Sequence, residues 1–275
     1  MLSLHTNNAA LSAQNAINRT QNSLSTSMTR LSTGYRINSA MDDAAGLQIA
    51  SRLKAQTSGM SVAMRNTQNS TSMLQTAEGA LDEVSNMLVR MKDLATQAAD
   101  ASSTTDDKTA MKSEYDALAT ELKNVMDNTS FGGTKLLTAG TVASSMTFQI
   151  GASASETMSI NLSTDMTAVG TSVTSVTSAN ISSAANGAIT TLDTALTNVN
   201  KVRSGLGAAA NRLEHVYNNL ANVSTNTKAA TGRIMDVDFA SESANMTSNQ
   251  MLLQAGTAML KQTNSMSSMV MSLLQ

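Results

Sequence analysis

Apolar residues recur along much of this chain at alternating spacings of three and four, the period of helices that pack as coiled coils. One series covers residues 185–223, a second residues 74–98, a third residues 111–125, and a shorter one begins at residue 17. The pattern predicts several long helices lying side by side, with each series facing a shared core. The members are Ile17, Leu24, Met28 and Leu31; Leu74, Ala77, Leu81, Val84, Leu88, Met91, Ala95 and Ala98; Met111, Tyr115, Leu118, Leu122 and Val125; and Ala185, Ala188, Leu192, Ala195, Val199, Val202, Leu206, Ala209, Leu213, Val216, Leu220 and Val223.

Changes in composition mark where the helical pattern stops. The polar run 101–107 predicts a break before the third helix, with Thr105 or Asp106 as its N-cap. Apolar and polar side chains then alternate on both sides of a Gly/Ala/Ser run, which predicts a short β-hairpin at about 146–162. Residues 163–180 are rich in Ser, Thr and Val with little charge, and we expect them to form a surface linker.

The two ends of the chain are unusually poor in charge. Residues 1–29 carry only Arg19 apart from a histidine, and residues 243–275 carry only Lys261. A helix with one face in water normally carries charge on that face. We therefore expect the two ends to pack against each other and against copies from neighbouring subunits, rather than to be frayed tails. A helix lying on a membrane surface would need a cluster of Lys and Arg that neither end has.

Composition excludes several classes of protein. Apolar residues make up 41 % of the chain but aromatic residues only 2 %, which suits a thin core between helices. Proline and cysteine are both absent, so neither a fixed helix break nor a disulfide or thiolate site is expected. The net charge of −2 argues against nucleic-acid binding, and no apolar run is long enough to insert into a membrane. The first residues do not resemble a secretory signal peptide, so export would use another route.

No candidate group has the pattern of a catalytic, metal or cofactor site. Asp42 and Asp43 are adjacent, but neighbouring residues on a helix point in different directions, and capping or an interface contact is the expected role. The two histidines, His5 and His215, lie in unrelated segments and form no His-Glu-x-x-His zinc motif. Gly132 and Gly133 lack the lysine of a phosphate-binding loop. We therefore expect a protein that is not an enzyme and needs no cofactor.

Several long motifs, in order, resemble those of bacterial flagellins. Residues 31–50 (LSTGYRINSAMDDAAGLQIA) resemble the N-terminal flagellin signature, and the likeness continues at 75–81 (QTAEGAL). It resumes at 206–208 and 211–214, then at 233–238 (RIMDVD) and 254–260 (QAGTAML). Residues 147–151 also resemble the flagellin hairpin, but the large outer domains that many flagellins carry after it are missing.

Pattern and resemblance together predict a mainly α fold. Long antiparallel helices would form a coiled-coil rod with one small β-hairpin, and the N- and C-terminal segments would pair. The resemblance implies an inner coiled-coil domain made of residues 1–44 and 236–275. It also implies a rod domain over 45–235, with helices at 45–100, 108–129 and 181–230.

The resemblance also implies a set of functional residues. The apolar stripes of the two ends would form the assembly interface, through Leu4, Leu11, Ile17, Leu24, Met28, Leu31, Leu252, Met259, Met266, Val270 and Leu273. A joint between inner tube and rod would be built by Arg36, Asn38, Asp42, Asp43 and Gly46. The epitope that the vertebrate Toll-like flagellin receptor recognises in some flagellins maps onto Arg90, Leu94 and Glu114.

The function implied is that of a structural subunit of the bacterial flagellar filament. Its expected partners are further copies of itself in a helical homopolymer, a flagellar export chaperone, the filament cap and hook-associated junction proteins. Its expected location is the extracellular filament, reached by the flagellar type III apparatus. Two alternatives remain open: a hook–filament junction protein, and a chemoreceptor-like coiled-coil signalling module, which would lack a β-hairpin.

Overall fold

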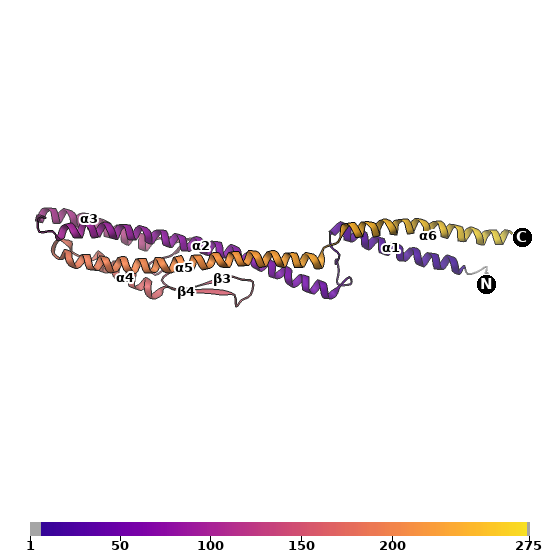
Figure 1. Ribbon diagram of the computed structural model, residues 1–275, viewed down its shortest axis with the longest axis horizontal. Helices are drawn as coiled ribbons and strands as arrows, with labels where there is room; N and C mark the ends of the chain where they lie inside the picture. Colours follow the sequence, from indigo (N-terminus) through magenta and orange to yellow (C-terminus); the bar gives the residue numbers. More distant parts are fainter. Residues whose placement is uncertain (1–6, 274–275) are drawn as a thin grey trace. The chain divides into compact units, whose positions relative to one another are not determined.

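Six helices and two short strand pairs make up the chain, which is seen here in a computed structural model that describes residues 7–273, with side chains as far as Met266 (Figure 1). The mainly α fold predicted from the heptads is confirmed. In chain order the elements are α1 (Asn8–Thr33), α2 (Ala44–Ala99), α3 (Thr105–Asn128), β1 (Ser130–Phe131), β2 (Thr134–Lys135), β3 (Ser145–Gln149), β4 (Thr157–Asn161), α4 (Ser163–Thr177), α5 (Ile181–Met235) and α6 (Phe239–Leu273).

Contacts divide the chain into two compact units. The terminal unit joins the described residues up to Ala55 with those from Asn226 onward, and the central unit covers Gln56–Thr225. The predicted domain boundaries at 44/45 and 235/236 lie near the start of α2 and at the end of α5, whereas the two units divide at 55/56 and 225/226. The assignment of inner-tube and rod roles to the segments they separate stays a prediction.

The core of the central unit is the one that the heptads predict. Every member of the series from Leu74 to Ala98 is buried, and so is nearly all of the series from Ala188 to Leu220. Ion pairs along the edge join α2 to α5: Arg203 Nη2 lies 2.8 Å from carboxylate oxygens of both Glu78 and Asp82. They pair positions in the second half of α2 with one in the first half of α5, as an antiparallel arrangement requires.

The N-cap of the third helix lies one residue before the first of the two predicted caps. Thr104, not Thr105 or Asp106, is the N-cap: its hydroxyl accepts a bond from the backbone N–H of Asp107, whose carboxylate accepts one from the backbone N–H of Thr104. This reciprocal pair satisfies two of the unpaired donors at a helix start. The cap position was misassigned because Thr104, Thr105 and Asp106 are all acceptable capping residues.

The predicted hairpin is confirmed as β3 and β4, which pair antiparallel. Met146 lies opposite Ile160 and Phe148 opposite Met158, so the apolar side chains share the face that packs on the core. The loop is closed by Gln149, whose side-chain amide donates to the carbonyls of Gly151 and Ser153. Its tip approaches α2, where a Cβ on Gly59 would lie 2.7 Å from that of Ala152.

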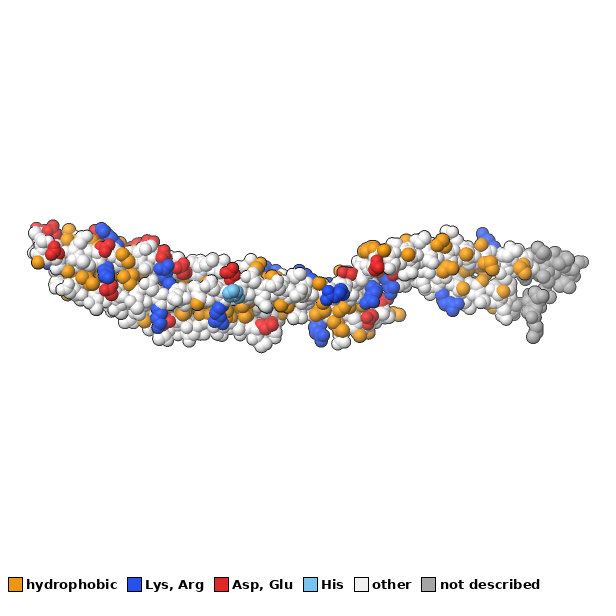
Figure 2. Space-filling model, viewed as in Figure 1, with side chains coloured by type: hydrophobic (Ala, Val, Ile, Leu, Met, Phe, Trp, Pro, Cys, Tyr) orange, Lys and Arg blue, Asp and Glu red, His pale blue; other side chains and the backbone are white. Residues whose placement is uncertain are grey.

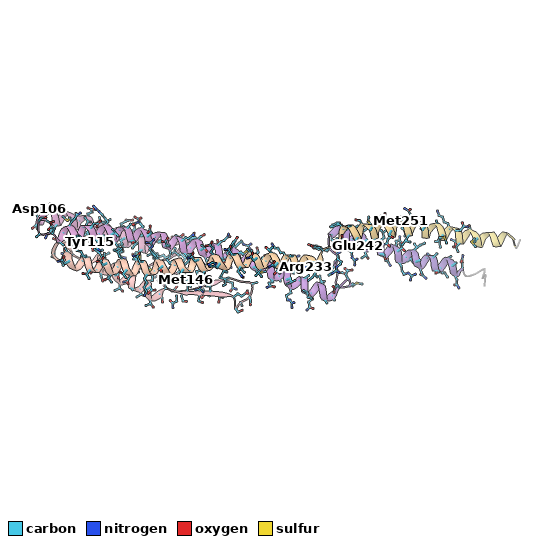
Figure 3. The ribbon with its side chains drawn as sticks, viewed as in Figure 1. Asp106, Tyr115, Met146, Arg233, Glu242 and Met251 are labelled. Carbon is cyan, nitrogen blue, oxygen red and sulfur yellow. The ribbon has the colours of Figure 1, made fainter. Side chains whose placement is uncertain are left out.

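The linker predicted over 163–180 is wrong, because residues 163–177 form α4. Met166, Val169, Val173 and Val176 are buried at helical spacing against the core. The Ser and Thr hydroxyls between them donate to carbonyls of the preceding turn, as Thr171 does to Thr167 at 3.0 Å. Burial of the apolar side chains against the core offsets the low helix propensity of these residues. The buried hydroxyl of Tyr115 on α3 donates to the Val176 carbonyl at 2.9 Å and so ties α4 to α3 (Figure 3).

Candidate functional site

The two charge-poor ends pair with each other in the terminal unit, as α1 and α6 (Figure 1). The pair is antiparallel: Asn7, at the start of α1, donates to the carbonyl of Thr263, while Arg30, near its end, lies 3.8 Å from the Glu242 carboxylate at the start of α6. Glu242 is 8 % exposed in this contact. The predicted pairing of the N- and C-terminal segments is therefore confirmed.

Close approach of the two helices depends on small residues. A Cβ built on Gly256 would lie 3.0 Å from Cγ1 of Ile17. The α1 residues that are half-buried or buried follow a three-four spacing apart from Arg30, and the described ones of α6 follow it throughout. On α1 they are Ala10, Ala13, Ile17, Thr20, Leu24, Ser27, Arg30 and Leu31, and on α6 they are Glu242, Met246, Asn249, Leu253, Gly256, Leu260 and Thr263.

A second stripe of α6 faces away from α1 and is open to water. Met251, Leu252, Met259 and Met266 are 57–63 % exposed, although they are among the most apolar side chains of the helix. Leu11 and Met28 on α1 are exposed to a similar extent. Hydrophobic side chains are scattered over the visible surface of α1 and α6, with few charged ones among them (Figure 2). Met251 is labelled on α6 in Figure 3. We call Leu11, Met28, Met251, Leu252, Met259 and Met266 the outer stripe.

The predicted assembly residues therefore separate into two groups. Ile17, Leu24 and Leu31 lie in the spacing that closes α1 on α6, whereas Leu11, Met28, Leu252, Met259 and Met266 lie in the outer stripe. Leu4 and the side chains of Val270 and Leu273 lie outside the described residues. The predictions missed the inner positions of α6, because a search for the most apolar stripe passes over Gly256 and Thr263.

Of the predicted joint residues, four lie in the loop between α1 and α2, and Gly46 lies in the first turn of α2. Main-chain bonds tie this loop to the α5–α6 connection: Arg36 N donates to the Met235 carbonyl at 2.6 Å, and Val237 N donates to the Gly34 carbonyl at 3.0 Å. The Arg36 guanidinium adds a bond to the Ile234 carbonyl at 3.0 Å. Gly34 has φ +75, a left-handed conformation that other residues adopt only with strain.

The carboxylates of the two adjacent aspartates accept hydrogen bonds from backbone N–H groups of the loop and of the first turn of α2. Oδ2 of Asp42 accepts hydrogen bonds from the backbone N–H groups of Ser39 and Asn38. These bonds, of which that from Ser39 has the larger effect, lower the pKa of the Asp42 carboxyl below its usual 3.8. Asp43 accepts the N–H of Gly46 at 2.8 Å and caps α2. A Cβ on Gly46 would lie 2.9 Å from Ile37, which is 2 % exposed. Asp43 thus has the expected capping role, while the mechanical role of the loop stays a prediction.

The predicted receptor epitope is only partly at the surface. Arg90 and Glu114 are exposed and paired, with Nη2 and Oε1 2.6 Å apart, and they join α2 to α3. Leu94, however, is 2 % exposed and belongs to the core of the central unit. The expectation that Leu94 offers an apolar surface contact is wrong, because it falls at the spacing that also buries Leu88, Met91 and Ala95.

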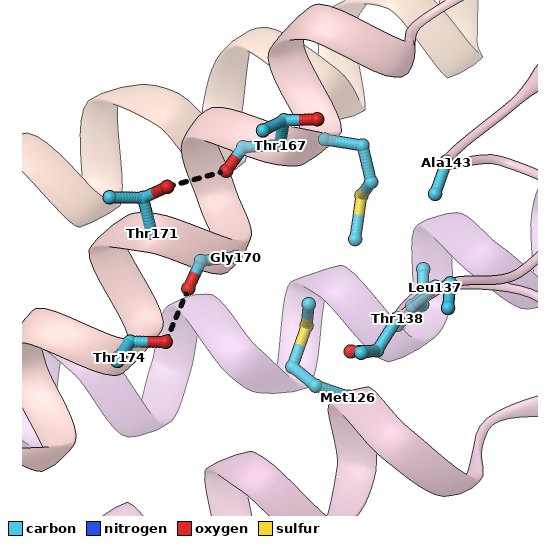
Figure 4. A pocket seen from close by; sticks show the side chains of 10 residues that line it. Met126, Leu137, Thr138, Ala143, Thr167, Gly170, Thr171 and Thr174 are labelled. Carbon is cyan, nitrogen blue, oxygen red and sulfur yellow. Dashed lines mark hydrogen bonds between the residues drawn. The ribbon is translucent and has the colours of Figure 1, made fainter.

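One cleft of the central unit lies between α3, the loop after β2 and α4 (Figure 4). Met126, Leu137 and Met166 are among the residues that line it. The α4 threonines that line it are bonded within their own helix, as Thr171 donates to the Thr167 carbonyl and Thr174 to that of Gly170. None of its lining residues is titratable. Among the described residues, no three His, Cys, Asp or Glu side chains are grouped as metal ligands, and no helix is long and apolar enough to cross a membrane.

Comparison with known proteins is consistent throughout. Residues 4–142 match the family model described as bacterial flagellin N-terminal helical region, and residues 189–274 match that of the bacterial flagellin C-terminal helical region. A flagellin of Halalkalibacterium halodurans is 40 % identical over 90 % of both chains. The flagellar filament 33 kDa core protein of Treponema phagedenis is 36 % identical over 98 % of both.

Solved structures give the same result at the level of the fold. The crystal structure of Bacillus cereus flagellin superposes with a TM-score of 0.50 at 32 % identity, covering 61 % of this chain and 94 % of that one. A putative flagellar hook-associated protein from Vibrio parahaemolyticus superposes with a TM-score of 0.58 at 18 % identity, covering 71 % of this chain and 100 % of that one. The second likeness concerns the fold alone.

Proposed function

The chain belongs to the bacterial flagellin family, and from this we propose how it assembles into a filament. The family is structural and non-enzymatic, and the chain is a subunit that polymerises with copies of itself into the extracellular bacterial flagellar filament. Mechanism here therefore means the geometry of assembly. The observation that carries our proposal is the division of α6 into a stripe closed by α1 and an outer stripe left in water.

The outer stripe supplies the driving force for polymerisation in this proposal. Fully burying a Leu or Met side chain is worth about 1.5–3 kcal/mol, so each side chain that is more than half exposed retains on the order of 1 kcal/mol for a neighbouring subunit to gain. Several such side chains lie along one helix pair. Lys261 is the only charged residue in 243–275, so little charge has to be desolvated when copies meet.

The remaining parts follow from that arrangement. The α1–α6 pairs of successive subunits pack together as an inner tube, and the central units form the rods around it. The loop tied by Arg36, Asp42 and Asp43 is the joint between the two. Residues 1–44 and 236–275 then form the inner domain and residues 45–235 the rod.

A polymerisation assay tests this proposal. Subunits released by mild heat or acid are returned to neutral pH, and the critical concentration for filament growth is measured by sedimentation. Replacing Leu252 and Met259 with Gln should raise it at least about tenfold, because apolar burial between subunits is lost. The exchanged pair Leu252→Met with Met259→Leu is the matched control, since it keeps the stripe apolar, and it should polymerise like the wild type. Unchanged growth of the Gln variant would refute the role of the outer stripe.

We also propose that partners cover the same stripe before assembly. A flagellar export chaperone would bind residues 252–274 during secretion. The filament cap would then receive the subunit at the growing tip, and hook-associated junction proteins would contact the base of the filament. Calorimetric titration of the chaperone with wild type and the double Gln variant tests the first contact: affinity should fall for the variant and persist for the exchanged control.

Recognition by a Toll-like flagellin receptor would rest on Arg90 and Glu114, since Leu94 is buried. Charge removal in Arg90→Ala should weaken receptor activation, whereas Arg65→Ala, on the same helix outside the predicted epitope, should not. Equal loss in both variants would contradict the epitope. The hook–filament alternative has a likeness in fold alone, and the chemoreceptor alternative does not account for the β3–β4 hairpin.

A further inference from the structure

Among the described side chains, the buried and the exposed methionines lie in different units, whereas Met64, Met73, Met111, Met235 and Met246 have intermediate exposure. Those that are buried lie in the central unit, and they are Met60, Met87, Met91, Met126, Met146, Met158 and Met166. Those that are exposed lie in the terminal unit, and they are Met28, Met41, Met251, Met259 and Met266. Except for Met41, in the loop before α2, the exposed ones all belong to the outer stripe. Exposed thioethers are therefore concentrated where we propose that subunits meet.

Packing does not explain this choice of residue. Leu252 occupies the same stripe one position from Met251 and is exposed to the same degree, so leucine is acceptable there. The property that distinguishes methionine is its sulfur, which is oxidised to a sulfoxide when it is accessible. The chain contains no Cys and no Trp, so it offers peroxide no thiol or indole as a competing target.

We infer that Met28, Met251, Met259 and Met266 form an oxidation site through which reversible sulfoxide formation lowers the ability of the free subunit to polymerise. In the reaction, the thioether sulfur attacks a peroxide oxygen. The O–O bond breaks, an S–O bond forms, the sulfur loses two electrons, and the other peroxide oxygen leaves as water. A flexible apolar side chain becomes a polar one, and a reductase of the methionine sulfoxide class restores it.

The consequence for assembly follows from the outer stripe, so this inference rests on the proposed function. A sulfoxide oxygen remains hydrated in the free subunit and loses its water when a neighbour covers it. Such desolvation without a replacement hydrogen bond is unfavourable. Once the filament has formed, the same methionines are covered. The site therefore responds to oxidant before assembly and not after it.

Site-resolved oxidation tests the inference. Monomer is treated with hydrogen peroxide, and sulfoxide at each methionine is followed by peptide mass spectrometry. The four outer-stripe methionines should react at least about tenfold faster than Met91, Met126 and Met158, which are no more than 3 % exposed. The critical concentration of the oxidised subunit should rise at least about tenfold, and reductase treatment should reverse the rise. Preformed filaments should resist oxidation at these four positions.

Two variants make the test specific. Met→Leu replacement at positions 28, 251, 259 and 266 should leave polymerisation insensitive to peroxide, whereas Met41→Leu should remain as sensitive as the wild type. Equal reactivity of buried and exposed methionines, normal growth of oxidised wild type, or persistent sensitivity of the fourfold variant would each overturn the inference. If the fourfold variant does not polymerise at all, the oxidised wild type is the test: the inference fails unless reductase treatment lowers its critical concentration again. Failure of untreated wild type to polymerise would instead contradict the proposed function.

Discussion

A substitution at the contact between Gly256 and Ile17 tests the packing of α1 against α6 directly. In Gly256→Leu, the new side chain must occupy space that Ile17 already fills, since even a Cβ there would lie 3.0 Å from Cγ1 of Ile17. Overpacking of this kind typically costs about 1–3 kcal/mol. Replacing a helical glycine recovers up to about 1 kcal/mol in helix propensity. A net loss of about 1–2 kcal/mol remains, which corresponds to a change of about 5- to 30-fold in an equilibrium constant.

The critical concentration for filament growth should therefore rise about 5- to 30-fold in Gly256→Leu. Ile17→Ala makes room, so the double variant should polymerise better than Gly256→Leu alone, although Ile17→Ala by itself weakens the pair. This non-additivity separates overpacking from a general effect on α6. Limited proteolysis of the monomer checks that the loss lies in the terminal unit, since the central unit should stay resistant. Wild-type growth of Gly256→Leu, or no rescue in the double variant, would refute the reasoning.

Three further predictions concern the core, the joint and α4. Leu206→Ala leaves a cavity in the central core and should lower the free energy of unfolding by about 2–5 kcal/mol in a thermal melt of the monomer. The pKa of Asp42 is lowered in the folded chain, so this carboxylate stabilises the fold above pH 3.8, and the stabilisation is lost as pH falls below that value. Asp42→Asn should therefore make the acid transition of the terminal unit shallower, and an unchanged transition would contradict this. Burial raises the pKa of Tyr115 to about 12, so the stability of the folded chain should fall as pH rises from 10 toward 12. In Tyr115→Phe this part of the decline should be absent. The variant should also be less stable than the wild type by about 1 kcal/mol at neutral pH, because the hydrogen bond to Val176 is missing.

The long helices could be predicted because their period and their packing are set by the same residues. The series from Leu74 and from Ala188 repeat over many turns, so a few half-buried members do not obscure the pattern. In α4 only four apolar residues carry the spacing, and the Ser and Thr between them have lower helix propensity. What keeps them helical is the burial of that apolar face against the rest of the central core, which the segment's own sequence does not show.

The candidate site could be predicted only in part, for a related reason. The lack of charged residues predicted that the two ends pair, and the motif residues predicted where the joint loop lies. The positions that close α6 on α1 could not be read from apolarity, because Gly256 matters there for the volume it lacks. Likewise Leu94 and Arg90 are four residues apart in sequence, yet one is in the core and the other in water, because a helix turns through slightly more than one full turn in four residues.

The two stripes of α6 share no residue, and this has a consequence for how the protein can change over generations. Substitutions among Met251, Leu252, Met259 and Met266 alter what a subunit offers to its neighbours while leaving the contact with α1 in place. Substitutions at Leu253, Gly256 or Leu260 affect the helix pair itself. Natural variation, and deliberate redesign of fibre stiffness or subunit exchange, can thus proceed along one side of the helix without endangering the other.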